Sequence, residues 1–332
     1  MAASYQRKFA VTSTGILKTP LIETFLDASV CRAPLFLRPR NIDAVAGWGA
    51  KESGRRAAKV ARKLGVPVLY LEDGFLRSIR PGKTSPGYSL VIDHEGIYYD
   101  STRPSTLESL LNSDSQLLAG IEGSVARAKH LILTHQLSKY NHAPRLATRD
   151  LREHDSQRVL VVDQTAGDNS VETGGANAHT FQRMLAAALT ENPEATIYVK
   201  THPEVSAKTK RGYLTDIVED ERTVVLRHPI NPMSLVAKMD RVYTVTSTMG
   251  FEALLAGRQV TCFGIPWYSG WGVTDDRQLC SRRSRSRSID ELFAAAYFHY
   301  TTYINPRNRK RGDIFDVISW LAEHSTSSDT HD

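Results

Sequence analysis

The sequence has few cysteines and no long apolar segment. Its three cysteines, Cys31, Cys262 and Cys280, lie far apart in a chain of 332 residues. An odd number at such spacing argues against a disulfide framework and against a zinc site. No apolar run approaches the roughly 20 residues of a membrane-spanning helix, and residues 1–8 lack the apolar core of a signal peptide. We therefore expect a soluble, cytoplasmic protein.

Acidic residues are slightly outnumbered by basic ones. The chain has 42 Lys and Arg against 36 Asp and Glu, which gives a formal net charge of +6 at pH 7. Its hydrophobic content of 41% and charged content of 23% are ordinary for a globular protein. The positive charge suggests an anionic partner, which could be a nucleotide, lipid headgroups, an acidic sugar or RNA. Charge alone does not choose among these.

Apolar and helical patterns alternate in residues 1–150 and predict an N-terminal αβ domain. Short apolar runs predict strands at 9–12, 44–47, 66–71, 90–93, 96–99 and 131–134. Helices are predicted at 21–26, 51–64 and 106–118, and a second helical stretch follows the last of these and ends at residue 130. Gly65 follows the second helix as an expected C-cap. The polar segment 146–157 is typical of a linker.

A second αβ domain is predicted over residues 151–285. Strands are expected at 159–163, 197–200, 224–226, 242–246 and 260–263, and helices between them at 181–189, 232–239 and 251–256. This alternation implies a parallel sheet. In residues 286–332, helices at 289–303 and 313–323 are expected to pack back across the domain boundary. Two facing αβ domains leave a cleft, a common place for ligands.

The segment 159–203 reads as a βαβ unit with polar residues at both strand ends. Open α/β sheets bind ligands at the carboxyl ends of their strands, where Asp168 and His202 are expected. Asp168 could attack an anomeric carbon and form a covalent adduct, bind a metal, or brace the loop at Gly174 and Gly175. His202 could donate to a leaving phosphate oxygen or bond a loop carbonyl. Asp163 is a weaker candidate that could simply hold the turn.

A donor-binding segment is predicted where a strand passes into a helix at 246–248. Ser247 and Thr248 could seat a phosphate at the helix N-terminus, or act as ordinary N-caps. Glu252, one turn into the helix, could hold a ribose hydroxyl pair or be an exposed helix carboxylate. Lys200 could add positive charge nearby or extend outward.

Glu72 and Asp73 end a strand of the first domain. Paired carboxylates across a cleft from a nucleophile suit general-base work on an acceptor hydroxyl, and the alternative is loop capping. Basic and polar residues that could bind an anionic acceptor are Arg77, Lys139, Tyr140 and Asn141.

Two further segments admit two interpretations. The arginine-serine tract at 281–288 resembles an RNA-binding tract, but its shortness favours a solvated loop, which could also touch anionic lipid headgroups. The aromatic residues Trp267, Tyr268 and Trp271 could stack on a base or sugar, or belong to the core.

Nine stretches together resemble one known family, the KpsC/LipB capsule polysaccharide proteins. They are LEDGFLRS at 71–78, GIYYD at 96–100, SKYN at 138–141, VVDQT at 161–165, VKTHP at 199–203, YTVTS at 243–247, GFEALLAG at 250–257, VTCFG at 260–264 and GWGVTDDR at 270–277. The resemblance covers about residues 15–320.

This resemblance implies a retaining β-Kdo glycosyltransferase of GT-B architecture, in which two Rossmann-type αβ domains face each other across a central cleft. The donor would be CMP-β-Kdo, and the acceptor a Kdo-bearing lipid at the inner face of the inner membrane. By the same resemblance Asp168 is the nucleophile, His202 lies at the donor phosphate and Glu72 is the acid/base. Ser247, Thr248 and Glu252 fall in the CMP-binding segment, and we expect Gln164 and Lys200 beside them.

The implied mechanism is a double displacement at one carbon, which retains configuration. CMP is a good leaving group, so no metal or other cofactor is expected. Other members carry two modules in tandem, so this single module is not expected to build an alternating linker unaided. Expected partners are anionic inner-leaflet lipids and other capsule-assembly proteins, and no nucleic acid is expected.

Two other functions remain open from the sequence. An inverting CMP-sialic-acid-type transferase would share the acidic-acidic-Gly motif, Glu72 to Gly74, and the His-Pro motif at His202. A basic RNA-binding protein would instead use the arginine tract.

Overall fold

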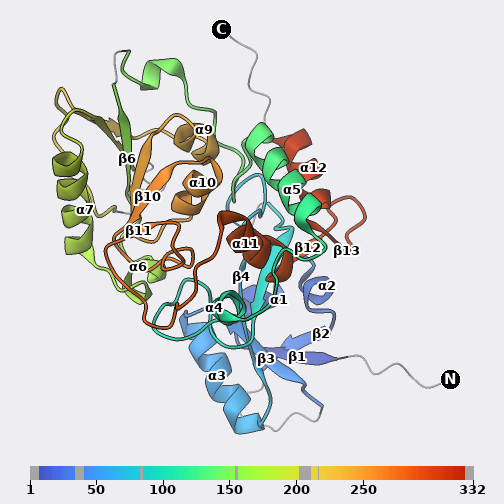
Figure 1. Ribbon diagram of the computed structural model, residues 1–332. Coiled ribbons are helices and arrows are strands. Elements are labelled where there is room, and N and C mark those ends of the chain that lie inside the picture. The colour runs from blue at the N-terminus through green and yellow to red at the C-terminus, as the bar shows by residue number, and fades with distance from the viewer. Residues whose placement is uncertain are drawn as a thin grey trace.

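The computed structural model describes residues 7–33, 41–82, 85–153, 156–201, 211–215 and 217–325. Within them the chain forms two β-sheets, each flanked by helices, which lie next to each other in Figure 1. The α/β class and the two facing αβ domains expected for a GT-B-like protein are confirmed.

The N-terminal domain is built on a seven-stranded sheet of order β13-β12-β5-β4-β3-β1-β2. Strands β2, β1, β3 and β4 run parallel, while β5, β12 and β13 add antiparallel pairs at the other edge. The strands are β1 (Lys8–Val11), β2 (Ser29–Arg32), β3 (Ala44–Trp48), β4 (Val68–Asp73), β5 (Ser89–Asp93), β12 (Thr301–Ile304) and β13 (Arg311–Gly312).

Helices cover both faces of this sheet. The helices are α1 (Thr14–Leu17), α2 (Ile22–Leu26), α3 (Glu52–Leu64), α4 (Thr106–Asn112), α5 (Glu122–His135) and the 3-10 turn η1 (Thr148–Asp150). Helix α3 ends at Gly65, whose φ of +69° is the left-handed conformation expected of a glycine C-cap. It packs very close to β3, because a Cβ on Gly54 would lie only 1.8 Å from the carbonyl oxygen of Gly49.

Two strands predicted in this domain are wrong. Residues 131–134 lie in α5, where only Ile132 of the apolar run is fully buried, because a short apolar run cannot distinguish a buried strand from a helix face. Residues 96–99 form a turn whose backbone Glu95 and Gly96 N–H groups donate to Asp93 Oδ1 at 2.8 and 3.0 Å. The Asp93 side chain thus accepts the backbone hydrogen bonds that a partner strand would otherwise accept. Strand β2 was not predicted.

The C-terminal domain has a six-stranded sheet of order β11-β10-β9-β6-β7-β8, and every described pair is parallel, as predicted. Its strands are β6 (Arg158–Val162), β7 (Thr196–Lys200), β8 (Thr223–Leu226), β9 (Arg241–Thr244), β10 (Gln259–Cys262) and β11 (Asp275–Asp276). Its helices are α6 (Asn169–Thr173), α7 (Ala178–Glu191), α9 (Pro232–Val236) and α10 (Met249–Leu255).

The last segment returns to the N-terminal domain. It contains α11 (Ile289–Phe293), the π-helix η2 (Ala294–His299), β12, β13 and α12 (Ile314–His324). The helix predicted over 289–303 therefore ends at His299, because the following β-branched and aromatic residues of β12 pair with β5 and extend the first sheet. In Figure 1 this segment, in red, lies beside α5.

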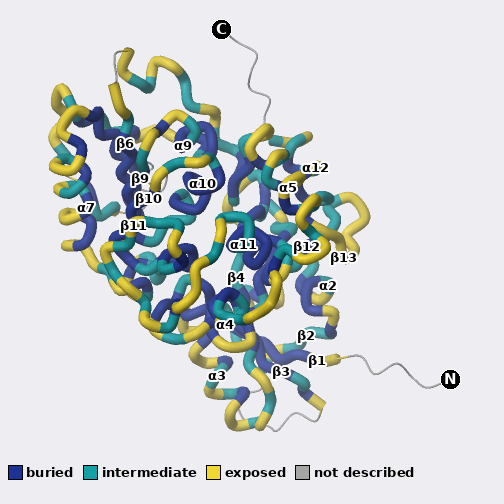
Figure 2. The backbone as a smooth tube through the Cα atoms, viewed as in Figure 1, coloured by how far each residue is buried: buried dark blue, intermediate teal, exposed yellow. Residues whose placement is uncertain are grey.

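One apolar cluster extends through both domains. It joins Tyr70 and Phe75 of the first domain to Phe251 and Trp267 of the second and to Tyr297 of the last segment. Figure 2 shows the buried residues of α10 and α11 between the two sheets. None of the described helices has both the length and the apolar character needed to cross a bilayer.

Candidate active site

The carboxyl ends of β6 and β9 are tied together by Gln164. These strands are neighbours. The buried Gln164 side chain accepts from the Thr246 backbone N–H at 2.9 Å and donates to Thr246 Oγ1 at 3.1 Å. Ser170 Oγ lies 3.1 Å from the same hydroxyl. Gln164, expected to bind the donor, thus has a clear role in positioning the loop that follows β6.

Asp168 stands at the partly exposed rim of this network. Gly167 precedes it with a φ of +82°, a conformation that favours glycine and turns the chain sharply. Asp168 caps α6 by accepting from the Ser170 backbone N–H at 3.0 Å, and its Oδ2 lies 3.5 Å from Gln164 Nε2. The carboxylate of this half-buried residue is therefore held in one orientation by its neighbours.

Asp163 holds the turn, as one of its predicted alternatives had it. Its Oδ1 accepts from the backbone N–H groups of Gln164, Tyr213 and Leu214 at 2.9, 3.1 and 3.2 Å. Burial raises the pKa of this carboxyl to about 6. The side chain is 2% exposed, so it is a scaffold residue.

Lys200 is buried, and the predicted outward extension is wrong. Its Nζ donates to the carbonyl oxygens of Thr201, Leu226 and His228 at 2.6, 3.2 and 3.0 Å. Desolvation lowers its pKa to about 8. These contacts indicate a tie between the ends of β7 and β8. The other prediction at this strand end, His202, lies outside the described residues.

Ser247 and Thr248 precede α10. The Met249 backbone N–H donates to Ser247 Oγ at 3.3 Å, whereas the Thr248 side chain makes no capping hydrogen bond. Tyr268 Oη donates to the Ser247 carbonyl oxygen at 2.5 Å and holds the turn from behind. The Thr248 hydroxyl therefore remains directed at the space next to the helix.

Glu252 is buried, so the exposed-carboxylate alternative is wrong. Its side chain is 6% exposed, and its Oε1 accepts from Ser138 Oγ of the other domain at 2.5 Å. Its Oε2 is buried and has no hydrogen-bond partner among the described residues. Desolvation, only partly offset by Ser138 and Lys139, raises the pKa of this carboxyl to about 7. A buried acceptor without a partner indicates a place where a ligand hydroxyl could donate.

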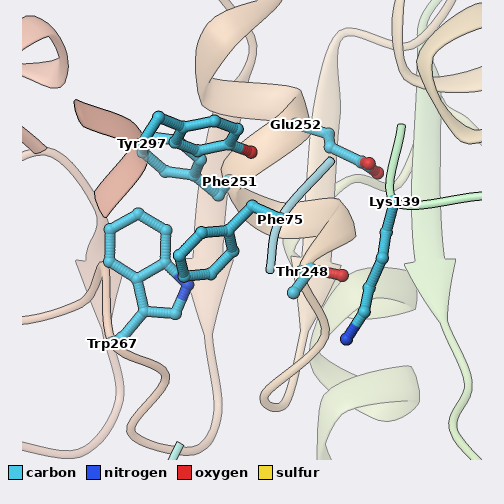
Figure 3. Close-up of a pocket in the computed structure, with 7 residues that line it drawn as sticks. All are labelled: Phe75, Lys139, Thr248, Phe251, Glu252, Trp267 and Tyr297. Carbon is cyan, nitrogen blue, oxygen red and sulfur yellow. The ribbon is translucent and has the colours of Figure 1, made fainter. Parts of the chain in front are cut away.

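A small pocket lies at the domain junction, shown in Figure 3. Its lining comes from both domains and the last segment: Phe75, Lys139, Thr248, Phe251, Glu252, Trp267 and Tyr297. The aromatic rings pack together on one side, with Phe251 and Trp267 centroids 4.4 Å apart. Lys139 reaches past Thr248 from the opposite side. The pocket thus combines an apolar wall, a cation, a hydroxyl and a carboxylate.

Glu72 and Asp73 end β4 at the facing edge. Glu72 Oε1 accepts from the Asp73 backbone N–H at 3.1 Å, and Asp73 Oδ1 pairs with Arg77 Nε at 2.8 Å. Arg77 also donates to Ser78 Oγ, at 2.8 Å. Of the residues predicted to bind the acceptor, Asp73 and Arg77 are therefore occupied with each other, whereas Glu72 is half-buried with little to restrain it.

Lys139 and Tyr140 lie beside these carboxylates. Burial works against the charge of Lys139, but the nearby Tyr98, Tyr140, Glu72 and Asp73 together raise its pKa above the ordinary value. Its ammonium group makes no hydrogen bond or ion pair to the part of the chain that the structure describes, apart from a contact 6.0 Å above the Tyr140 ring. It is therefore a cation available to an anionic ligand.

Asn141, also predicted to bind the acceptor, is 2% exposed. Its Nδ2 donates to the carbonyl oxygens of Ser78 and Ser138 at 3.1 and 2.8 Å, and its Oδ1 accepts from the Ser138 N–H. This placement indicates a structural role, in which Asn141 shapes the loop that carries Lys139.

The two sheet edges are joined by residues that the sequence did not single out. Thr173, the last residue of α6, donates to the Tyr99 carbonyl oxygen at 3.1 Å, and Ser101 N–H donates to the Thr173 carbonyl oxygen at 3.0 Å. The Tyr99 ring lies in the field of Glu72, which contributes to raising its pKa. Tyr99 therefore connects the neighbourhood of Glu72 to the short helix that Asp168 begins.

The arginine tract is not a solvated loop, and that prediction is wrong. Arg282 and Arg283 reach Glu108 of α4 at 2.6 and 3.1 Å, and Arg283 is buried. Arg285 pairs with Asp114, and Arg287 donates to the Leu111 carbonyl oxygen at 2.8 Å. These arginines fasten the two domains together, which leaves them poorly placed for RNA or lipid.

The aromatic run at 264–272 belongs to the core. Tyr268 and Trp271 are almost completely buried, and only Trp267 lines the pocket. In the described ranges, no three side chains of His, Cys, Asp or Glu gather as metal ligands would.

Sequence relatives identify the family. The family model described as "Capsule polysaccharide biosynthesis protein" matches residues 43–307. The capsule polysaccharide modification protein LipA of Neisseria meningitidis serogroup A is 44% identical over 328 residues, which cover 96% of this chain and 46% of LipA. The lipopolysaccharide-processing protein LpsZ of Rhizobium meliloti is 40% identical over 277 residues, covering 83% of this chain and 63% of LpsZ. The chain spans about half the length of LipA.

Solved structures agree with the sequence relatives. A structure titled KpsC, beta Kdo 2,4 transferase, from Thermosulfurimonas dismutans is 45% identical with a TM-score of 0.89, covering 96% of this chain and 98% of its own. One titled KpsC, beta Kdo 2,7 transferase, from the same organism is 27% identical with a TM-score of 0.66, covering 97% and 100%. The resemblance to KpsC is confirmed, although the Neisseria relatives are named LipA and not LipB. The chain belongs to the capsule polysaccharide biosynthesis protein family.

Proposed function

We propose that this chain is a retaining glycosyltransferase that moves β-Kdo from CMP-β-Kdo to a Kdo-bearing lipid acceptor. The observation that carries the proposal is the likeness, over 96% of the chain, to the KpsC beta Kdo 2,4 transferase structure. The placement of Asp168 and Glu72 at the two sheet edges fits such a reaction. The chain covers about half of LipA, so a complete linker would need a second module or partner.

In the first step, the Asp168 carboxylate attacks the anomeric carbon of the donor sugar. The bond from that carbon to the phosphate oxygen breaks, and CMP leaves with the bonding electrons. The sugar is then held as an ester on Asp168. The hydrogen bond from Ser170 N–H orients the attacking group in advance, which lowers the entropic cost of attack. CMP leaves readily as an anion, so the step as proposed uses no metal.

In the second step, an acceptor hydroxyl attacks the same carbon from the opposite side. Glu72 takes the hydroxyl proton, the new glycosidic bond forms and the Asp168 carboxylate is released. Two inversions at one carbon retain the configuration. Glu72 suits this task because it lies half-buried at the strand end, where its Oε1 accepts a hydrogen bond from the adjacent Asp73 N–H.

The donor would occupy the C-terminal side of the junction. Glu252 Oε2, which has no partner among the described residues, could accept from a ribose hydroxyl, and Thr248 lines the same pocket. For the ribose to bind, the contact between Glu252 and Ser138 would have to adjust. His202, expected at the donor phosphate, completes this proposed set.

The acceptor would occupy the N-terminal side, where the acidic sugar of a Kdo-bearing lipid needs a cation. Lys139 supplies it, because its ammonium group is not used by the described residues. Its neighbours Glu72 and Asp73 keep the local charge balanced when no ligand is bound.

The linkage is proposed to be of the 2,4 type. Identity to the 2,4 module structure is 45% against 27% for the 2,7 module, and the TM-scores are 0.89 and 0.66. Because both structures cover nearly the whole chain, these differences in identity and TM-score favour the acceptor geometry of the 2,4 module. We further propose that the protein works at the inner face of the inner membrane, alongside other capsule-assembly proteins.

The test is a transfer assay with the purified chain, CMP-Kdo generated in place and a short synthetic acceptor ending in Kdo. A new β-Kdo linkage at position 4 of the acceptor sugar, read by NMR, supports the proposal. An α-linked product, or transfer of sialic acid from CMP-sialic acid with no Kdo transfer, would instead support the inverting alternative. Mass spectrometry of the intact protein during turnover should detect Kdo on Asp168.

A further inference from the structure

Helix α3 carries an exposed basic face that the proposed reaction does not use. Six cations lie on its exposed side, with Glu52 as the one acid of the helix: Lys51, Arg55, Arg56, Lys59, Arg62 and Lys63. At about 100° per residue they fall within roughly 140° of the circumference. We call these six residues the α3 basic face.

The opposite side of the helix packs against the N-terminal domain. Gly54, Ala57 and Ala61 are buried against the sheet, and the Gly54 backbone lies too close to the turn at Gly49 to admit any side chain. The helix has 13 residues, so it is a rigid rod roughly 20 Å long. The basic face therefore has a fixed shape.

At least half of its six cations are not used in contacts within the described part of the protein. Arg56 pairs with Glu52 at 2.6 Å, and Arg55 donates to the Ala50 carbonyl oxygen at 2.8 Å. Lys59, Arg62 and Lys63 make no hydrogen bond or ion pair to any described residue. Three or more free cations on one rigid face create a strong local positive potential.

The position of α3 links this face to the acceptor side of the site. The helix begins just after β3, where Ala50 N–H donates to Tyr99 Oη at 3.0 Å, next to Glu72. From there it runs to the lower end of the molecule in Figure 1, away from the second sheet. The N-terminal end of α3 therefore lies at the acceptor side of the site, and the rest of the helix extends from it.

We propose that the α3 basic face docks the protein on an anionic membrane surface by contact with phospholipid headgroups. The proposal rests on the proposed lipid acceptor, which must be reached at a membrane. The face is positively charged over roughly 20 Å of helix, so it suits a broad anionic surface, and it presents no aromatic side chain on which bases could stack. Because no apolar residue is available to insert, binding is electrostatic and weakens with ionic strength.

The test is sedimentation with vesicles of phosphatidylcholine, with and without phosphatidylglycerol, and with no donor or acceptor sugar. The whole chain should bind the anionic vesicles and release them as salt is raised. The triple variant Lys59→Gln, Arg62→Gln, Lys63→Gln should bind roughly 10- to 100-fold more weakly. A matched control, Arg183→Gln, Lys238→Gln, Lys310→Gln, removes the same charge from exposed scattered positions and should bind nearly as wild type.

Two results would overturn the docking proposal. One is equal vesicle binding by the α3 variant and the wild type. The other is loss of affinity for a mixed-sequence RNA by the α3 variant with vesicle binding intact. Transfer to a water-soluble acceptor, measured in parallel, should be unchanged in the α3 variant. If the wild type binds anionic vesicles through α3 but transfers no Kdo, the proposed function fails while the docking surface stands.

Discussion

The two sheet edges at the domain junction hold their polar residues in different ways. At the edge of the six-stranded sheet, Gln164, Ser170 and Thr246 form a hydrogen-bonded network around Asp168. At the edge of the seven-stranded sheet, Glu72 and Lys139 interact electrostatically, and their side chains make few hydrogen bonds. The polar side chains of the first edge are hydrogen-bonded to one another in the free protein. At the second edge, the Lys139 ammonium group remains available to a ligand.

This difference corresponds to the two proposed half-reactions. A nucleophile gains from being oriented before the sugar arrives, because misplacement by about 1 Å can cost roughly 100-fold in rate. An acceptor site must admit and release a charged product, so an unpaired cation suits it better than a closed network. The five predictions below test this contrast.

The largest effect is expected from Asp168→Asn, which should lower transfer by more than roughly 1000-fold. Asparagine can still cap α6, so the melting temperature should change little. The measurement is the initial rate together with thermal unfolding. Glu172→Gln, an exposed carboxylate on the same helix, is the matched control and should remain active. Full activity in Asp168→Asn would remove this residue from the chemistry.

Glu72→Gln should slow turnover by roughly 100-fold, because the acceptor hydroxyl loses its base. The first displacement does not need Glu72, so the sugar-protein adduct should accumulate. Intact-mass spectrometry during turnover measures this adduct. If turnover falls and no adduct builds up, Glu72 acts before the sugar reaches Asp168, and the division between the two edges is wrong.

Gln164→Met tests the network edge. It leaves the partly buried Thr246 N–H without its acceptor, at a cost of about 1–3 kcal/mol in folding free energy. Because Asp168 also loses a neighbour, kcat should fall roughly 30-fold with little change in KM. Denaturant unfolding and steady-state kinetics measure the two effects. Loss of stability with unchanged kcat would show that the network holds the fold but does not orient the nucleophile.

Glu252→Gln tests the contact that joins the edges. Burial raises the folded-state pKa of Glu252 to about 7, above its ordinary value of 4.5. The folded state therefore binds an extra proton between these values, so stability is fully present below about pH 4.5 and is lost as pH rises through about 7. Glutamine removes this loss and should stabilise the protein at pH 8 by on the order of 2 kcal/mol.

Near pH 4.5 the two proteins should have equal stability, since both side chains are then neutral. Unfolding by urea at the two pH values measures the difference. A stability gain for Glu252→Gln that is the same at both values would mean that the pKa of Glu252 is not raised in the folded protein.

Lys139→Met should give the smallest effect, an increase of roughly 10-fold in KM for the anionic acceptor. The lysine ammonium group makes no hydrogen bond or ion pair to described residues, so folding should be unaffected or slightly improved. The KM for CMP-Kdo should not change. An equal rise in KM for donor and acceptor would mean that Lys139 contacts both substrates. The proposed difference between the two sheet edges would then be wrong.

Much of the fold follows from local patterns in the chain. Gly65 ends α3 because only a residue tolerant of positive φ fits there, and the alternating apolar runs of the second domain form the predicted parallel sheet. The predictions failed where a short run was ambiguous, as at 131–134, or where a strand paired with a partner far away in the chain, as β12 does with β5.

The sequence predicted where several candidate residues lie better than it predicted what they contact. Asp168 and Glu72 were expected at strand ends and lie there. Lys200 and Asn141 were expected to meet ligands, yet backbone carbonyls take up their donors. No local signal distinguishes these cases, because the partners of Lys200 include Leu226, on the neighbouring strand.

The sequence by itself determined the class of fold, the positions of most strands and helices, and the family. Only the tertiary structure decided which charged side chains are buried and paired within the protein. Arg283 and Glu252 are both polar residues in unremarkable local settings, and each is buried by a partner from the other domain, Glu108 and Ser138. Burial and pairing depend on residues more than 100 positions away, so they arise only when the two domains meet.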